Sequence, residues 1–297
     1  MAIVLLAGCS DGAAVPVDMM PGFRETVLPT TEGGRPSPRA VHVGPDGDRY
    51  VLDTLGQVLA FRPDGSLRGR WWMPDYSVGR PEGICVTTGG DVYVADTHYH
   101  RVVQFDAAGN VVRTFGTRGE EPGQFEYPVA VELDDAEDFL YVAEYGGHDR
   151  VQKFTLDGEY VSEFGEVGTG PGQFQRASGL VFRRGSDGVG RVFVSDAINQ
   201  QVHVFTEDGV FERLLGEGPQ LGFPYDIAGG PGGVLAAANY STGTVTLFDE
   251  DGSLRGVYGG AGRDAGQLWT PWGVAVAGDG TVIVADTGNR RLVEFRP

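Results

Sequence analysis

One phrase recurs six times along this chain of 297 residues. It reads VADTHYHRVVQF from Val94 and VADTGNRRLVEF from Val284, and more divergent copies begin at Val51, Val142, Val194 and Ala237. Each copy carries an acidic or amide residue at the same place, at spacings of 43, 48, 52, 43 and 47 residues: Asp53, Asp96, Glu144, Asp196, Asn239 and Asp286. Repeats of this length predict units that stack as a solenoid or close as a ring.

Every unit has the same order of short apolar segments and turns. Five units open with a proline-led segment, such as PEGICV at Pro81 and PWGVAV at Pro271, and the fourth opens with ASGLVF at Ala177. A turn, the recurring phrase, a second turn and a short segment follow, which predicts a four-stranded antiparallel meander. The 48 Gly and 17 Pro disfavour long helices. The predicted fold is therefore all-β, a six-bladed β-propeller of four-stranded antiparallel blades.

This order of segments and turns resembles that of the NHL-repeat family, whose repeats carry VADTxNxR and PxG[IV]AV motifs and build six-bladed propellers. The resemblance extends from about Phe23 to Pro297 and is clearest in the second and sixth units, with VADTHYHR and VADTGNRR. It implies the same fold as the repeat pattern does.

The sixth unit ends without an outer strand. Its last segment, RRLVEFRP, finishes the chain, so the blade needs a strand from elsewhere. The segment FRETVL, from Phe23 to Leu28, has a suitable length and alternation. We predict that this N-terminal strand completes blade six and closes the ring, which removes an unprotected sheet edge.

The N-terminus, MAIVLLAGCS, resembles the lipobox of bacterial lipoproteins, in which a Cys after small residues becomes lipidated. The basic segment expected of a signal peptide is missing, and a chance Cys in an apolar N-terminus is the alternative. The resemblance implies a signal segment over residues 1–9, lipidation of Cys9 and a flexible tether over 10–22 before the propeller at 23–297. It also implies an exported protein on the periplasmic face of the envelope or the cell surface, and Ser10 after the Cys favours the outer membrane.

The formal charge of -18 disfavours nucleic acid and anionic membrane surfaces as partners. Contact with a membrane is therefore expected through the lipid anchor only, and the chain is expected to act as a monomer. Cys85 lies in the apolar segment GICV, which predicts a buried, inert thiol.

The recurring acidic residues have a structural interpretation. Asp or Asn at the entrance to a tight turn accepts hydrogen bonds from backbone amides one or two residues further on. Because the feature is present in every unit, we assign it to the fold. Arg101, Arg150 and Arg290, at the matching site of the phrase, are predicted to pack or pair between blades.

Function is expected where the units differ. In a four-stranded blade, the entrance to the innermost strand and the turn between the second and third strands open on one face, at the mouth of the central channel. These positions supply aromatic, imidazole and charged groups of the kind that recognition sites use. The predicted ligand-binding residues are Arg39, Glu82, Tyr225, Trp272, His98, Tyr145, His148 and Tyr240. The expected ligand is a protein, peptide or glycan; unrelated loop residues with no shared ligand are the alternative.

An enzyme is the alternative class. The lyase that completes peptide amidation is similar in its repeats and holds zinc with channel histidines, one of them directly after an opening proline. None of the corresponding residues here is His, so this ligand set is not carried over; they are Arg39, Glu82, Val129, Ser178, Tyr225 and Trp272. His98, His100 and His148 would bind zinc only if they converged.

Propeller lactonases resemble the chain in fold and need a carboxylate and amide cage for calcium, for which Glu82, Asp226 and Asn239 are possible members. No catalytic residue set and no cofactor are predicted, although Ca or Zn stays open. The primary hypothesis is a binding or scaffold module. A metal-dependent lyase, lactonase or other hydrolase and a structural component of an envelope assembly are the alternatives.

Overall fold

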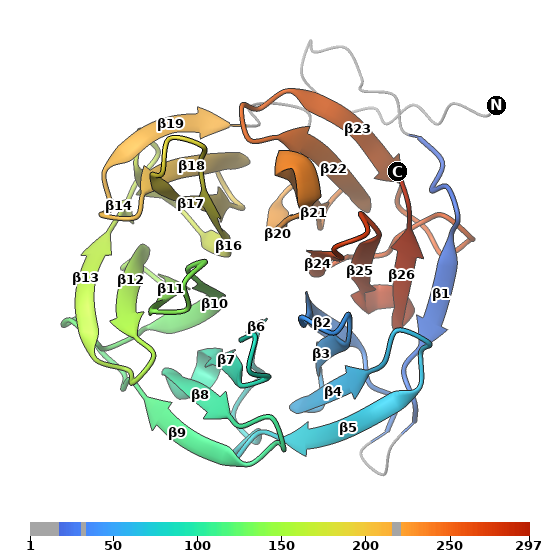
Figure 1. The fold of residues 1–297 in the computed structure, drawn as a ribbon, viewed down its shortest axis with the longest axis horizontal. Coiled ribbons are helices and arrows are strands. Elements are labelled where there is room, and N and C mark those ends of the chain that lie inside the picture. Colours follow the sequence, from blue (N-terminus) through green and yellow to red (C-terminus); the bar gives the residue numbers. More distant parts are fainter. Residues whose placement is uncertain (1–17, 31–33, 216–220) are drawn as a thin grey trace.

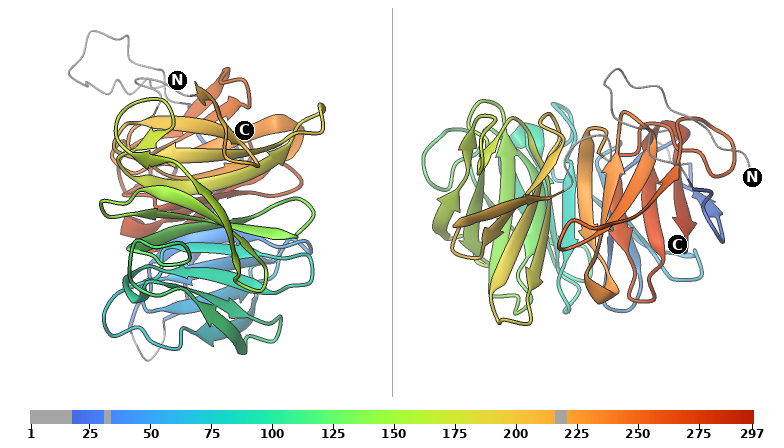
Figure 2. Two further views of the ribbon diagram at one scale, coloured as in Figure 1. Left: turned by 90° about the vertical axis from the view of Figure 1, so that its left-hand side faces the viewer. Right: turned by 90° about the horizontal axis from the view of Figure 1, so that it is seen from above.

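The computed structural model describes residues 18–30, 34–215 and 221–297. Within these ranges, six four-stranded antiparallel sheets form blades around a central axis (Figure 1). Edge-on views show the strands running between two loop-bearing faces (Figure 2). The predicted all-β, six-bladed propeller is confirmed.

Each of the first five blades uses four consecutive strands, the innermost first. Blades one and two comprise β2 (Pro38–Val43), β3 (Arg49–Asp53), β4 (Gln57–Phe61) and β5 (Leu67–Trp72), then β6 (Gly83–Val86), β7 (Val92–Asp96), β8 (Arg101–Phe105) and β9 (Val111–Phe115). Blades three and four comprise β10 (Tyr127–Leu133), β11 (Phe139–Tyr145), β12 (Arg150–Thr155) and β13 (Tyr160–Phe164), then β16 (Ala177–Arg184), β17 (Gly190–Asp196), β18 (Gln201–Thr206) and β19 (Phe211–Leu215).

Blade five comprises β20 (Pro224–Gly229), β21 (Val234–Asn239), β22 (Thr244–Asp249) and β23 (Leu254–Gly259). Blade six comprises β24 (Gly273–Val276), β25 (Val282–Asp286), β26 (Arg291–Phe295) and the N-terminal strand β1 (Arg24–Val27). A short parallel pair, β14 (Glu166–Val167) with β15 (Gln173–Phe174), lies between blades three and four. The helical turns are η1 (Thr97–Tyr99), η2 (Pro231–Gly233) and η3 (Thr287–Asn289), and no helix in the described ranges is long and apolar enough to cross a membrane.

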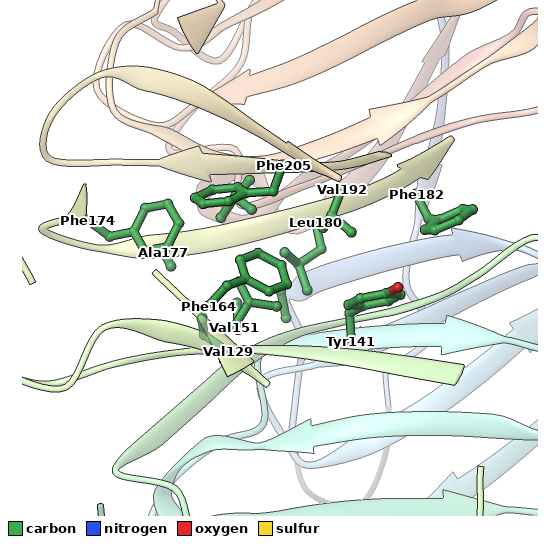
Figure 3. Close-up of a cluster of buried hydrophobic side chains, with 13 residues drawn as sticks. Val129, Tyr141, Val151, Phe164, Phe174, Ala177, Leu180, Phe182, Val192 and Phe205 are labelled. Atoms are coloured by element: carbon green, nitrogen blue, oxygen red, sulfur yellow. The ribbon is translucent and has the colours of Figure 1, made fainter. Parts of the chain in front are cut away.

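The core lies between neighbouring blades. A blade packs one face against each neighbour, so its middle strands are buried on both faces; all five residues of β7 are buried. The outer strand β9 is exposed or half-buried along its whole length. Figure 3 shows one inter-blade cluster, in which Tyr141 and Val151 of blade three pack with Leu180 and Phe205 of blade four. Burying one such side chain stabilises the fold by about 1.5–3 kcal/mol.

The ring is closed as predicted. Strand β1 pairs antiparallel with β26, from Arg24 opposite Glu294 to Val27 opposite Arg291 (Figure 1). The Nη1 atom of Arg291 also lies 2.6 Å from Oε2 of Glu25. The N-terminal strand therefore joins the last blade to the first.

The propeller's packed body begins earlier than expected. Asp18 donates its backbone N–H to the carbonyl of Val257 in β23, and Met20 is buried between blades five and six. Asp18 and Met20, within the segment predicted as a flexible tether, therefore contact the blades, whereas the side chain of Met19 between them is exposed. Residues 10–17 of the predicted tether, the signal segment and Cys9 lie outside the described residues.

The recurring acidic residues anchor blade edges, but their partners differ from those predicted. Asp53 makes the expected local turn, accepting N–H bonds from Leu55 and Gln57. In blades three to six the equivalent side chain ties the blade to the connector that precedes it; Asp286 accepts the N–H of Trp269 at 2.7 Å.

Three of the acidic groups pair with arginine. Asp96 lies 2.8 Å from Arg101, Glu144 lies 2.7 Å from Arg150, and Asp286 lies 2.8 Å from Arg291. In blade six, Arg291 pairs with Asp286, whereas the sequence predicted Arg290 in this role. Arg290 itself has a left-handed φ of 59° and ends the turn.

We expect that deletion of residues 1–28 will lower the melting temperature by roughly 10 °C. The deletion exposes the edge of β26 and removes the buried side chains of Met20 and Leu28. Each loss of burial costs about 1.5–3 kcal/mol, and each kcal/mol shifts the melting temperature by about 2–4 °C in a protein of this size. Thermal unfolding followed by circular dichroism measures the effect.

The matched control is deletion of residues 1–17, which leaves every described contact in place. If the two truncations melt at the same temperature, ring closure by β1 does not stabilise the propeller.

Candidate functional site

The channel mouth is formed by residues at the start of the innermost strands. Glu82 directly precedes β6 of blade two, and Tyr225 lies in β20 of blade five, on the opposite side of the ring (Figure 1). The Tyr225 hydroxyl donates a hydrogen bond of 2.7 Å to Oε2 of Glu82. This bond links side chains from opposite blades across the channel.

Two further predicted residues join this bridge. Arg39, in β2, donates from Nη2 to Oε1 of Glu82 at 2.9 Å. Its guanidinium carbon lies 3.9 Å from the ring centroid of Trp272, and Trp272 stacks on Tyr225 with centroids 4.5 Å apart. The structure therefore brings Arg39, Glu82, Tyr225 and Trp272 together as a contiguous network across the seam where the ring closes. Their role in ligand binding remains a prediction.

Arg176 belongs to the same network and was missed from the sequence. It directly precedes β16 and donates from Nη2 to the Tyr225 hydroxyl at 3.0 Å. The same nitrogen lies 3.9 Å from Oε2 of Glu82, and the guanidinium carbon lies 3.8 Å from the ring centroid of Tyr145. Arg176 lies one residue before the position of the opening proline, outside the positions that the repeat pattern singles out. The available signal is Ala177, which stands in blade four where the other units have proline.

Aromatic rings extend the network on one side. Tyr240, in the turn after β21, lies 6.1 Å from Tyr225 and 6.2 Å from Trp272 between ring centroids. Phe223, also missed from the sequence, lies 5.9 Å from Tyr240. Its φ of 57° is unusual for an aromatic residue. Phe223, Tyr240 and Trp272 are half-buried, so they present partly accessible rings beside the bridge.

Histidine rings lie on the other side. His98, in η1, and His100 pack against Tyr127, with centroids 6.0 Å and 5.6 Å away, and Tyr127 stacks on Tyr145 at 5.3 Å. Both histidines also contact backbone carbonyls through Nδ1. No hydrogen bond or ring contact in the described ranges joins His148, in the β11–β12 turn, to these residues. Predicted site residues His98 and Tyr145 are thus connected to the bridge, and His148 is not.

The residues predicted as possible zinc or calcium ligands are not gathered into one metal site in the described part of the chain. Among described residues, no group of three or more His, Cys, Asp or Glu is arranged to hold a metal. Asn239 is buried within blade five, where it accepts the N–H of Gly222 and donates to Thr244 and Thr246. Asp226 accepts the N–H groups of Val274 and Ile227.

A chamber of about 260 Å³ lies within the ring of inner strands and is lined by residues of all six blades. Its polar lining includes His42, Glu132, Arg183 and Asp226. Burial raises the pKa of Glu132 to about 8 and that of Asp226 to about 7. Burial also lowers the pKa of His42 to about 4. Two carboxyl groups that titrate near neutral pH therefore face this chamber, a feature that strand alternation alone did not indicate.

The fold and the repeats define a six-bladed β-propeller, and comparison with known proteins finds NHL repeats in it. The NHL repeat matches residues 79–105 and 268–295, in blades two and six. NHL repeat-containing protein 3 of Mus musculus is 29% identical over 224 residues, 68% of this chain and 61% of that protein. NHL-repeat-containing protein 4 of Mus musculus is 34% identical over 89 residues, 29% of this chain and 63% of that protein. The chain thus spans about three fifths of each relative's length, and it is a six-bladed β-propeller that carries NHL repeats and is similar to these NHL-repeat-containing proteins.

Solved structures share the overall fold at low sequence identity. A streptogramin B lyase superimposes with a TM-score of 0.65 at 14% identity, over 92% of this chain and 96% of that chain. Virginiamycin B lyase from Staphylococcus aureus gives a TM-score of 0.62 at 14% identity, over 93% and 99%. At this identity the likeness establishes the fold alone.

We expect the protein to lose stability as pH rises through about 7 to 8. The folded-state pKa values of Glu132 and Asp226, about 8 and about 7, exceed the ordinary values of 4.5 and 3.8. The folded protein therefore binds these protons more tightly than the unfolded chain, and this stabilisation is lost on deprotonation. Melting temperatures at about pH 6.5 and about pH 9 measure the loss.

Glu132→Gln should reduce that pH-dependent loss, because the amide cannot ionise. Exposed Glu120→Gln is the control and should leave the loss unchanged. An identical decrease in the wild type and in Glu132→Gln would contradict the assignment of Glu132.

Proposed function

We propose that this NHL-repeat propeller is a binding module whose ligand, a protein, peptide or glycan segment, contacts the channel mouth. The observation that carries the proposal is the layer of aromatic and guanidinium groups at the mouth. Half-buried Trp272 and Tyr240 offer partly accessible rings, while the bonds from Arg39 and Tyr225 to Glu82 hold the layer in place.

Rigid aromatic groups of this kind favour recognition. They bury large areas with little loss of conformational entropy, and they recur as the energetic centres of binding surfaces. A site held in place before binding also loses less freedom when the ligand arrives. These properties support the mouth as the binding surface.

Trp272→Ala should weaken binding of a ligand found on peptide and glycan arrays by roughly 2 kcal/mol or more, the scale of an aromatic centre of binding. Trp269→Ala is the matched control, because Trp269 lies in the same connector and is 43% exposed but does not contact the bridge. Isothermal titration calorimetry and thermal melting of both variants measure affinity and stability. A lower melting temperature with unchanged affinity for Trp272→Ala would show that the ring only plugs the channel.

A channel enzyme is the second candidate, favoured by the carboxyl groups of Glu132 and Asp226. Groups with pKa values near the working pH are suited to proton transfer, and both face a chamber of about 260 Å³. The likeness in fold to virginiamycin B lyase suggests the first compound to try. Mass spectrometry of virginiamycin B incubated with wild type and with Glu132→Gln tests this candidate. The enzyme hypothesis requires that the wild type converts virginiamycin B and that Glu132→Gln does not.

We also propose that the protein is exported and held at the envelope by a lipid on Cys9. The sequence LAGCS supports this, because a Cys after small residues is typical of the site at which bacterial lipoproteins are lipidated.

When expressed with a functional bacterial signal segment, the full chain should partition into the detergent phase, and Cys9→Ser should remain in the aqueous phase. The physical reason is the acyl chain, which contributes about 0.8 kcal/mol per buried methylene. Triton X-114 partitioning followed by immunoblotting measures the distribution, with Cys85→Ser as the control. Equal partitioning of wild type and Cys9→Ser would contradict lipidation at Cys9.

A further inference from the structure

Charges at the channel mouth are arranged differently from those elsewhere in the protein. Five arginines each lie within 4 Å of two different carboxylates among the described residues; they are Arg101, Arg150, Arg184, Arg191 and Arg291. At the mouth, the ratio of carboxylates to arginines is reversed. Arg39 and Arg176 share Glu82, and neither has a second carboxylate within 4 Å in the described ranges.

The mouth therefore carries one positive charge in excess within a chain whose formal charge is -18. This excess is poorly hydrated, because the side chain of Arg39 is only 9% exposed and that of Arg176 is 19% exposed. The Nε atoms of both are buried without a hydrogen-bond partner in the described structure. Buried charge without a full set of partners is costly, so an added anion would be favourable here.

Both guanidinium groups are also held in orientation. Arg39 lies over Trp272 and Arg176 over Tyr145, at 3.9 Å and 3.8 Å from the ring centroids. Glu82 already shows that a carboxylate fits between Arg39 and the Tyr225 hydroxyl. The partly accessible rings of Trp272 and Tyr240 lie next to this position.

We propose that the mouth recognises a ligand carboxylate attached to a planar, apolar group. The ligand carboxylate binds Arg176 and Arg39 in place of, or beside, that of Glu82, and its planar group contacts Trp272 and Tyr240. This inference rests on the proposed binding function and specifies the chemistry of its ligand.

The test uses two probes of the same shape, hippurate and its neutral amide, hippuramide. Isothermal titration calorimetry at low salt should show that the wild type binds hippurate at least about tenfold more tightly, since only hippurate supplies the missing negative charge. Arg176→Met should abolish this preference. The control, Arg255→Met on the outer strand β23, should retain it.

Glu82→Gln separates recognition from structure. Removal of the Glu82 carboxylate increases the excess positive charge at the mouth. Hippurate should therefore bind several-fold more tightly, while the affinity for hippuramide changes little. A purely structural role for Glu82 predicts a lower melting temperature with no gain in hippurate affinity, and that result would overturn the proposal.

Other outcomes are equally decisive. Equal binding of hippurate and hippuramide that is lost in Trp272→Ala would overturn carboxylate recognition and retain the mouth as a binding surface. Binding of inorganic phosphate as tight as that of hippurate would overturn the assignment to carboxylates. If neither probe binds the wild type at millimolar concentration, the proposed ligand class is wrong, and the array ligand remains the test of the proposed function.

Discussion

The pairing of β1 with β26 is the constraint on which the geometry of the mouth depends. This pairing joins blade six to the chain that enters blade one, so it sets how the first and last blades meet. Arg39 belongs to blade one and Trp272 to blade six, and their contact at 3.9 Å lies on that seam. Blades bury their two faces only against neighbours, so an incomplete last blade would weaken both the core and the mouth.

Buried carboxylates give the recurring phrase its structural meaning. Desolvation raises the pKa of Asp96 to about 6 and also raises that of Asp286, and the arginines beside them offset this effect. In blade one, Asp53 has no such arginine contact and instead accepts two backbone N–H bonds. Such buried pairs are poor sources of net stability but specify which segments meet. Here they fix the turns next to the mouth to the connectors between blades.

The channel has two polar levels with different chemistry. At the mouth, two guanidinium groups and one carboxylate form a bridge flanked by aromatic rings. Within the ring of inner strands, the chamber contains carboxyl groups that bind protons near neutral pH. The excess of guanidinium groups at the mouth supports the proposal of anion recognition there, and the carboxyl groups of the chamber support the proposal of proton transfer within the ring.

The repeat pattern alone determined the number of blades, the four-stranded meander and the source of the closing strand, because each depends on spacing and alternation along the chain. It also indicated that Arg39, Glu82, Tyr225 and Trp272 share one face, since equivalent positions in a ring converge. Tertiary structure decided the rest. Arg176 joins the site only through neighbours far apart in sequence, and the bond from Tyr225 to Glu82 connects residues 143 positions apart. The raised pKa values of the chamber carboxyls and the packing of Met20 likewise depend on burial, which arises only when blades from the whole chain come together.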